Sequence, residues 1–187
     1  MPLEEPDTDA ETEFEQALCD AIRGGSSGLT TLFRAFQPRV LRYLRARDRD
    51  VADDIAGETW VAVARRIQSF EGDAGAFSAW LFTIARQRLA DHHRTSARRA
   101  TLPVADVPEV HVSVSSEDVA VAFDSAQGSV DFIARHLSGD QAEVVLLRTL
   151  AGLSAAEIAV SMQRTEGWVR VTHHRAMRRL AERLGEL

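Results

Sequence analysis

The sequence has a single cysteine, Cys19, which excludes an internal disulfide or a metal site built from several thiolates within one chain. It has no apolar run near the roughly 18 residues that a membrane span needs, and its acidic first 15 residues do not resemble a signal peptide. We therefore expect a cytoplasmic protein without membrane insertion. Lysine and asparagine are absent, so all 22 basic residues are arginine. Because both missing residues have A-rich codons, a GC-rich bacterial genome explains this surplus of arginine without selection for phosphate binding.

The composition is otherwise that of a globular protein, with 45% hydrophobic and 27% charged residues. The net charge of -6 argues against nucleic-acid binding, but the charge is unevenly distributed. Residues 1–24 carry a net charge of -7 and residues 101–130 carry -5, whereas residues 25–100 carry +5 and residues 131–187 carry +1. This arrangement favours two arginine-rich modules that face a polyanion. Solvated charge on helix surfaces is the alternative explanation.

An apolar period near 3.6 residues predicts an all-α protein of two small helical domains joined by a flexible linker. The linker begins at residues 101–116, which contain two prolines and no arginine. Helices are expected before it at residues 11–23, 30–47, 51–67 and 77–98, with a kink or break at Pro38. After it they are expected from Ser116 to Leu137, from Asp140 to Ala151, after the cap Ser154, and from the cap Thr165 to about Leu184. Three short helices with these turns are typical of a helix-turn-helix unit.

The last helix has two chemically different sides. Val169, Ala176, Leu180 and Leu184 recur on one side, which we expect to pack inward, and Arg170, His174, Arg175 and Arg178 lie on the other. A recognition helix offers its first turns to the major groove, where arginine can pair with guanine or phosphate. A generic amphipathic helix with an arginine surface has the same pattern.

Taken together, residues 137–148, residues 152–159, Thr165 to Arg170 and His174 to Ala176 closely resemble the carboxy-terminal domain of extracytoplasmic-function (ECF) sigma factors. The resemblance implies that this domain recognises the minus-35 promoter element. The residues implicated by position are Thr165, Gly167, Trp168, Arg170, Val171, His174 and Arg175, with Arg148 as a phosphate contact. The sequence departs from the family at Gln163, where a turn glycine is common, at Trp168, where a small hydroxyl residue is usual, and at His173, where an apolar core residue is usual. We therefore do not carry over a minus-35 sequence preference.

Residues 52–60 resemble the sigma-factor segment that docks on the clamp helices of the polymerase β′ subunit. The resemblance implicates Asp53, Asp54, Ile55, Glu58 and Trp60, with the two apolar side chains as anchors and the carboxylates at the rim. Gly57 replaces the usual glutamine of this motif. An acidic amphipathic helix with a buried tryptophan is the alternative.

Residues 77–86, followed by Asp91 and Arg94, resemble the family's promoter-melting helix, which recognises the minus-10 element. In the family the preceding loop captures an extruded base, which makes residues 69–75 the candidate pocket. The implicated residues are Ser69, Phe70, Glu71, Gly72, Asp73, Phe77, Trp80, Arg86, Gln87, Asp91 and Arg94. Phe77, Trp80 and Phe82 are nevertheless more typical of a core than of a base platform.

The sequence is therefore identified as an ECF-type sigma factor that directs core RNA polymerase to promoters and promotes melting. Its expected parts are an acidic extension (residues 1–24), a region 2-like domain (25–100), an acidic linker with the start of the next helix (101–130) and a region 4-like helix-turn-helix domain (131–187). The expected partners are core polymerase through its β′ clamp and β subunits, promoter DNA and an anti-sigma factor. No cofactor, metal or catalytic residue is expected.

Two other classes of protein match part of the sequence. A stand-alone helix-turn-helix regulator with a sensing or dimerisation domain explains residues 137–185, but it leaves the two amino-terminal motifs as coincidences. A metal-dependent phosphoesterase is suggested only by the tripeptide Asp91-His92-His93, which has no partner motif elsewhere in the sequence.

Overall fold

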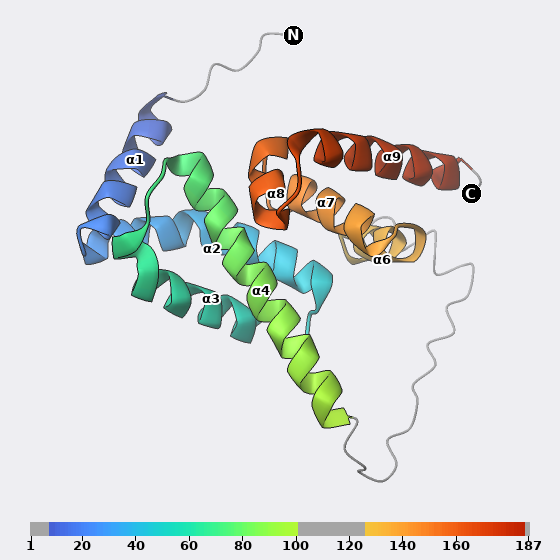
Figure 1. Ribbon diagram of the computed structural model, residues 1–187, viewed down its shortest axis with the longest axis horizontal. Helices are drawn as coiled ribbons and strands as arrows, with labels where there is room; N and C mark the ends of the chain where they lie inside the picture. Colours follow the sequence, from blue (N-terminus) through green and yellow to red (C-terminus); the bar gives the residue numbers. More distant parts are fainter. Residues whose placement is uncertain (1–7, 101–125, 186–187) are drawn as a thin grey trace.

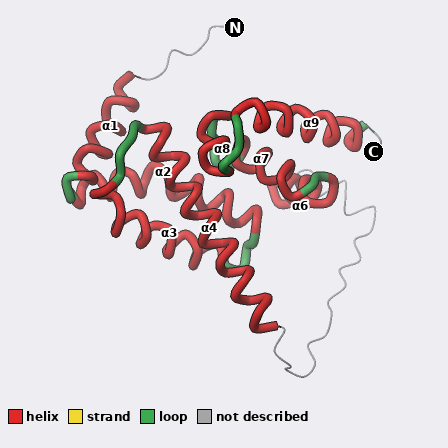
Figure 2. The backbone as a smooth tube through the Cα atoms, viewed as in Figure 1, coloured by secondary structure: helices red, strands yellow, loops and turns green. Residues whose placement is uncertain are grey.

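The computed structural model describes residues 8–100 and 126–185, which we call the amino-terminal half and the carboxy-terminal half. Every regular element in these two ranges is a helix (Figures 1 and 2), which confirms the predicted all-α class for this part of the chain. The predicted linker and the predicted helix start at Ser116 lie outside the described residues. The first described helix after them is α6 (Ala126–His136).

The amino-terminal half contains four α-helices and one 3-10 turn. They are α1 (Thr8–Ile22), α2 (Ser26–Arg47), α3 (Ala52–Arg66), the 3-10 turn η1 (Ile67–Ser69) and α4 (Ala74–Ala100). Of the kink or break predicted at Pro38, the break is absent, because α2 continues as one helix through this residue. The buried α2 residues Leu32, Phe36, Val40 and Leu44 recur every four positions on both sides of the proline, so packing holds the two segments in one helix.

Helix α1 packs on the helices that follow it. The Phe14 ring lies 5.6 Å from that of Phe36 and 6.0 Å from that of Phe77, measured between centroids. A Cβ placed on Gly28 would lie 2.2 Å from the carbonyl oxygen of Ala17, so glycine is required where α1 and α2 meet. The Gly28 amide also donates to the Asp20 carboxylate at 2.6 Å. Helix α1, which lies within the predicted acidic extension, therefore contributes to the same core as α2 and α4.

The carboxy-terminal half ends in three helices whose starts are capped by hydroxyl side chains. They are α7 (Gly139–Thr149), α8 (Ala155–Met162) and α9 (Glu166–Leu184). Ser138 and Ser154 form capping boxes, and the Thr165 hydroxyl accepts from the Trp168 amide. These observations confirm the caps predicted at Ser154 and Thr165. Gln163, between α8 and α9, has left-handed backbone angles (φ 55°, ψ 48°), which explains why glycine is common at this turn.

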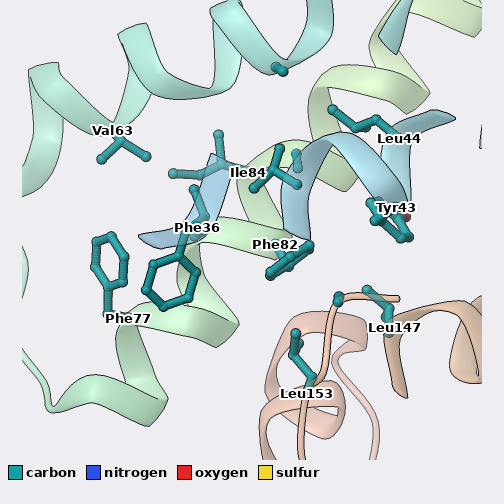
Figure 3. Close-up of a cluster of buried hydrophobic side chains, with 14 of the residues drawn as sticks. Phe36, Tyr43, Leu44, Val63, Phe77, Phe82, Ile84, Leu147 and Leu153 are labelled. Atoms are coloured by element: carbon teal, nitrogen blue, oxygen red, sulfur yellow. The ribbon is translucent and has the colours of Figure 1, made fainter. Parts of the chain in front are cut away.

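The two halves are packed against each other. Helix α4 lies against α8 and α2 lies against α7, as Figure 1 shows. One continuous buried cluster includes Tyr43 and Phe82 from the first half and Leu147 and Leu153 from the second (Figure 3). A second, smaller cluster, which includes Val145, lies within the carboxy-terminal half.

Candidate nucleic-acid interface

Helix α9 presents most of its predicted minus-35 residues to solvent. Val169, Ala176 and Leu180 are buried as predicted, although Leu184 is 49% exposed. Trp168 is half-buried, and the Arg164 guanidinium lies 5.3 Å from its ring centroid. The exposed members of the set are Thr165, Gly167, Arg170, Val171, His174 and Arg175. The structure therefore brings these side chains together along one helix.

The predicted phosphate contact Arg148 lies beside the start of α9. It is exposed, and its Nη1 donates to the Leu153 carbonyl oxygen at 2.8 Å. A cleft of about 490 Å³ is lined by Arg148, Arg170 and His173 among others. Burial, followed by the charges of Arg148 and His174, lowers the pKa of His173, which favours the neutral form of this side chain. The charged groups of the cleft are therefore Arg148 and Arg170 together with Glu166, which pairs with Arg170.

Helix α3 exposes only the carboxylates of its predicted polymerase contacts. Asp53, Asp54 and Glu58 are exposed, whereas Ile55 is 2% and Trp60 is 8% exposed. The Trp60 indole donates to Gln37 Oε1 at 2.6 Å. The two predicted apolar anchors therefore lie inside the amino-terminal half.

Two apolar side chains outside the predicted set do reach this surface. Phe33 is 41% and Val61 is 51% exposed, and the Phe33 ring lies 5.2 Å from that of Trp60. The sequence pattern could have indicated that Phe33 is exposed. Its neighbour Leu32 belongs to the set of α2 residues that are buried at every fourth position, and Phe33 does not.

The predicted loop 69–75 is shorter than expected, because α4 begins at Ala74 and not at Phe77, but its first part is exposed. Ser69, Glu71, Gly72 and Asp73 are exposed, although the Asp73 carboxylate also accepts from the Ala76 amide at 2.8 Å and so caps α4. These residues lie at one end of α4, next to the aromatic side chains described below.

The aromatic residues beside this loop are mainly core residues. Phe77 and Phe82 are fully buried, which confirms the core expectation for both. Phe70 and Trp80 are half-buried, with ring centroids 5.1 Å apart, and the Phe70 ring also contacts Phe77. Phe70 and Trp80 are therefore the aromatic side chains of this group that retain exposed surface.

The second part of α4 carries exposed polar residues. Gln87, Asp91 and Arg94 are exposed, and Asp91 is paired with Arg94. His93 Nε2 lies 2.9 Å from Asp48 Oδ2, and this hydrogen bond is the main cause of the lowered pKa of Asp48. The side chains of the Asp91-His92-His93 tripeptide therefore have different partners. Within residues 8–100 and 126–185, no three His, Cys, Asp or Glu side chains are grouped as metal ligands.

Arg86, predicted to contact the minus-10 element, is engaged with the other half of the chain. Its Nε donates to Glu143 Oε1 at 2.5 Å and its Nη1 donates to the Ser161 carbonyl oxygen at 2.6 Å. Tyr43 also donates to Glu143 Oε1, at 2.7 Å, and Arg47 Nη1 lies 3.4 Å from Glu143 Oε2. We call Tyr43, Arg47, Arg86 and Glu143 the Glu143 cluster. Sequence analysis did not anticipate it.

The fold defines a helical protein whose carboxy-terminal half is a helix-turn-helix unit with an exposed basic recognition helix. Residues 32–99 match the family described as Sigma-70 region 2, and residues 115–180 match the family described as Sigma-70, region 4. The chain is 31% identical over 178 residues to the ECF RNA polymerase sigma factor SigD of Mycobacterium tuberculosis, covering 91% of this chain and 84% of SigD. It is 32% identical over 183 residues to the ECF sigma factor BldN of Streptomyces coelicolor, covering 96% of this chain and 69% of BldN.

A solved structure has the same fold at lower identity. It is described as the structure of CnrH in complex with the cytosolic domain of CnrY, and it matches with a TM-score of 0.68 and 19% identity over 93% of this chain and 98% of the other. The chain belongs to the ECF subfamily of the sigma-70 family. It is an RNA polymerase sigma factor that directs core polymerase to promoters, and the regulator alternative is not favoured. No helix in the described part of the chain has the length and apolarity to cross a bilayer.

Proposed function

We propose that the exposed face of α9 recognises the minus-35 element, that α4 with the loop before it recognises the minus-10 element, and that α3 docks on the β′ clamp. The main observation in support of this proposal is that three basic side chains near the start of α9 are exposed in a row. They are Arg170, His174 and Arg175. A helix start adds free backbone amides to these side chains, which suits the major groove.

The minus-35 contact is supported by the surroundings of Arg170. Its guanidinium pairs with Glu166 one turn earlier, which orients it along the helix surface. An arginine held in this way can donate two hydrogen bonds to a guanine edge. Arg148, on the neighbouring helix α7, serves as the phosphate contact that fixes the orientation of the domain.

The polymerase contact combines carboxylates with apolar surface. Asp53, Asp54 and Glu58 provide negative charge, while Phe33 and Val61 provide the exposed apolar area that Ile55 and Trp60 do not. An apolar centre with a charged rim is the usual composition of a specific interface. Ile55 and Trp60 then act by holding α3 in position. The β subunit is the expected partner of the carboxy-terminal half.

The minus-10 contact is supported by the position of the exposed loop at the start of α4. Glu71 and Asp73 can accept hydrogen bonds from an extruded base, and the Phe70–Trp80 pair offers partly exposed rings for stacking. Gln87 and Arg94 extend the contact along the helix. Arg86 can take part in this contact with DNA only after its hydrogen bond to Glu143 is broken.

The remaining parts of the proposal concern the cellular setting. The protein acts in the cytoplasm, where core polymerase is found, and it contributes binding energy while polymerase performs the chemistry. It needs no cofactor. An anti-sigma factor is the expected inhibitor, by analogy with CnrH, whose structure is described as a complex with the cytosolic domain of CnrY.

The experiment is run-off transcription from a genomic-fragment library with purified core polymerase, with and without the protein. We expect discrete new transcripts whose promoters share two motifs about two helical turns apart. Arg170→Ala should reduce them about tenfold, because a bidentate base contact is worth about 1–3 kcal/mol.

The matched control is Arg179→Ala, an exposed arginine of the same helix that lies outside the row formed by Arg170, His174 and Arg178. It should leave the transcripts unchanged. No transcripts, together with specific duplex binding by the protein alone, would contradict the proposal and favour a stand-alone regulator.

A further inference from the structure

We propose that Arg164, in the turn between α8 and α9, is a further DNA contact of this chain, and that Trp168 is its positioning residue. The ligand of Arg164 is a phosphate of the DNA backbone at the edge of the major groove, so this contact adds affinity without reading sequence. The inference rests on the proposed minus-35 role of α9. It extends that role to a residue outside the set that the sequence predicted.

The backbone of Arg164 is fixed from both sides. Helix α8 is followed by Gln163, whose left-handed backbone angles turn the chain, and the Arg164 amide donates to the Ala159 carbonyl oxygen at 2.9 Å. The next residue, Thr165, caps α9 through the hydrogen bond that its hydroxyl accepts from the Trp168 amide at 3.2 Å. The end of one helix and the cap of the next therefore determine where the Arg164 side chain begins.

The side chain of Arg164 lies over the Trp168 ring. Its guanidinium carbon is 5.3 Å from the ring centroid, which is within the range of a cation–π contact. Trp168 is half-buried and packs against the buried cluster that includes Leu153 and Ile158. The interior of the protein therefore fixes the ring, and the ring in turn restricts the guanidinium.

This contact leaves the charge and the donors of Arg164 available to a ligand. A guanidinium on an aromatic ring uses its flat face, while its N–H donors point outward in the plane of the group. Arg164 is exposed, and the carboxylate nearest to it in the sequence, Glu166, is paired with Arg170. An exposed arginine in this state is suited to a phosphate group, which can accept two hydrogen bonds from it.

The position of Arg164 in the fold favours a phosphate over a base. In a helix-turn-helix unit the first helix crosses the DNA backbone, and the first turns of the second helix contact base edges. Arg164 belongs to the turn that joins these helices, two residues before α9 begins at Glu166. It therefore comes at the border of the groove, where the phosphates lie, whereas the proposed base contact Arg170 lies one turn inside α9.

The Trp168 ring increases affinity by restricting Arg164 before DNA binds. An exposed arginine samples many rotamers, and a contact that fixes one of them costs conformational entropy. Because Arg164 already lies on the ring, part of this cost is removed in advance. Loss of the ring should weaken DNA binding about two- to fivefold, as expected for an exposed cation–π contact. Trp168 then contributes only when Arg164 is present, and this dependence can be measured.

The test measures how tightly the reconstituted holoenzyme binds two DNA duplexes at a series of salt concentrations. One duplex carries a promoter recovered by the run-off experiment, and the other carries the same promoter with a scrambled minus-35 motif. The variants are Arg164→Gln, Trp168→Ala, Trp168→Phe and the double variant Arg164→Gln/Trp168→Ala. Arg179→Gln makes the same charge change at an exposed position of α9 outside the proposed contacts and is the control.

We expect Arg164→Gln to weaken binding to both duplexes by the same factor, about eightfold at about 0.1 M salt, and to reduce the salt slope by about one. Trp168→Ala should weaken binding about two- to fivefold, and Trp168→Phe, which keeps an aromatic ring, should restore most of the loss. In the Arg164→Gln background, Trp168→Ala should have no further effect. The control should bind as the native chain does.

Two results with Arg164→Gln would overturn the proposal. One is an unchanged affinity and salt slope, and the other is a loss confined to the intact promoter, because that pattern indicates a base contact. A further loss from Trp168→Ala in the Arg164→Gln background would overturn the positioning role, since Trp168 would then act without Arg164. Circular dichroism checks the helix content of each variant. Arg164→Gln, at an exposed position, keeps the test decisive if Trp168→Ala fails to fold.

Arg170→Ala, measured in the same way, separates this inference from the proposed function. If the proposed function fails, Arg170→Ala does not weaken binding to the intact promoter. If only the present inference fails, Arg170→Ala still weakens that binding, while Arg164→Gln does not.

Discussion

In the amino-terminal half the largest buried side chains are aromatic, whereas no aromatic residue in the described carboxy-terminal half is buried. The first half packs Phe36, Tyr43, Phe77 and Phe82 between long helices. The second half uses aliphatic side chains, and three of its four described helices are short, since α6 and α7 have 11 residues each and α8 has 8. Short helices gain little from their own length, so helix ends and turns carry more of their stability. The comparison teaches that the two domains of this chain, which match different regions of one family, are stabilised in two physically different ways.

The largest expected effect is the loss of an aromatic residue from the first half. Phe77→Ala removes a fully buried ring that contacts Phe14, Phe36, Phe70 and Trp80. We expect the free energy of unfolding to fall by about 3–5 kcal/mol, measured by guanidinium chloride titration. The control Phe33→Ala removes a partly exposed ring and should cost less than about 1 kcal/mol. Equal losses would contradict the assignment of Phe77 to a close-packed core.

A smaller effect is expected from the caps of the second half. Ser154→Ala removes the side chain that accepts from the Glu157 amide and leaves that amide without its partner at the start of α8. The free energy of unfolding should fall by about 1 kcal/mol. Ser27→Ala, in the first turn of α2, has an exposed side chain and should have almost no effect. If Ser27→Ala lowered the free energy of unfolding more than Ser154→Ala does, helix caps would not be more important in the carboxy-terminal half than in the amino-terminal half.

The smallest effect has the opposite sign. Gln163 occupies the left-handed region at the turn between α8 and α9, where a Cβ is unfavourable. Gln163→Gly should therefore raise the free energy of unfolding by about 0.5–1 kcal/mol, after subtraction of the greater freedom of glycine in the unfolded chain. Gln163→Ala keeps the Cβ and should show no gain. If both variants behave alike in denaturant titrations, the turn is not strained by its side chain.

The sequence predicted most helix boundaries because local chemistry sets them. Ser154 and Thr165 are caps whose hydrogen bonds reach only three residues ahead, so their role is visible in the sequence alone. Pro38 is the counterexample. Local rules predict a kink or break there, but buried contacts on both sides keep α2 in one helix.

The candidate site was predicted less completely because burial depends on distant segments. The motif around Trp60 correctly marked α3, but it did not show that Trp60 points toward Gln37 on α2. The partner of Arg86 lies 57 residues away, and no periodicity connects the two positions. The exception is Glu143, a carboxylate next to the apolar run 144–147, which is a sequence signal of a buried charge with a tertiary partner.

The shared buried cluster of the two halves has a consequence for thermal unfolding. Phe82 and Leu147 belong to the same cluster, so melting of either half exposes apolar surface of the other to water. Coupling of this kind makes two domains behave as one cooperative unit in calorimetry, with a single heat-absorption peak. Without the shared cluster, each half would have only the stability of its own interior.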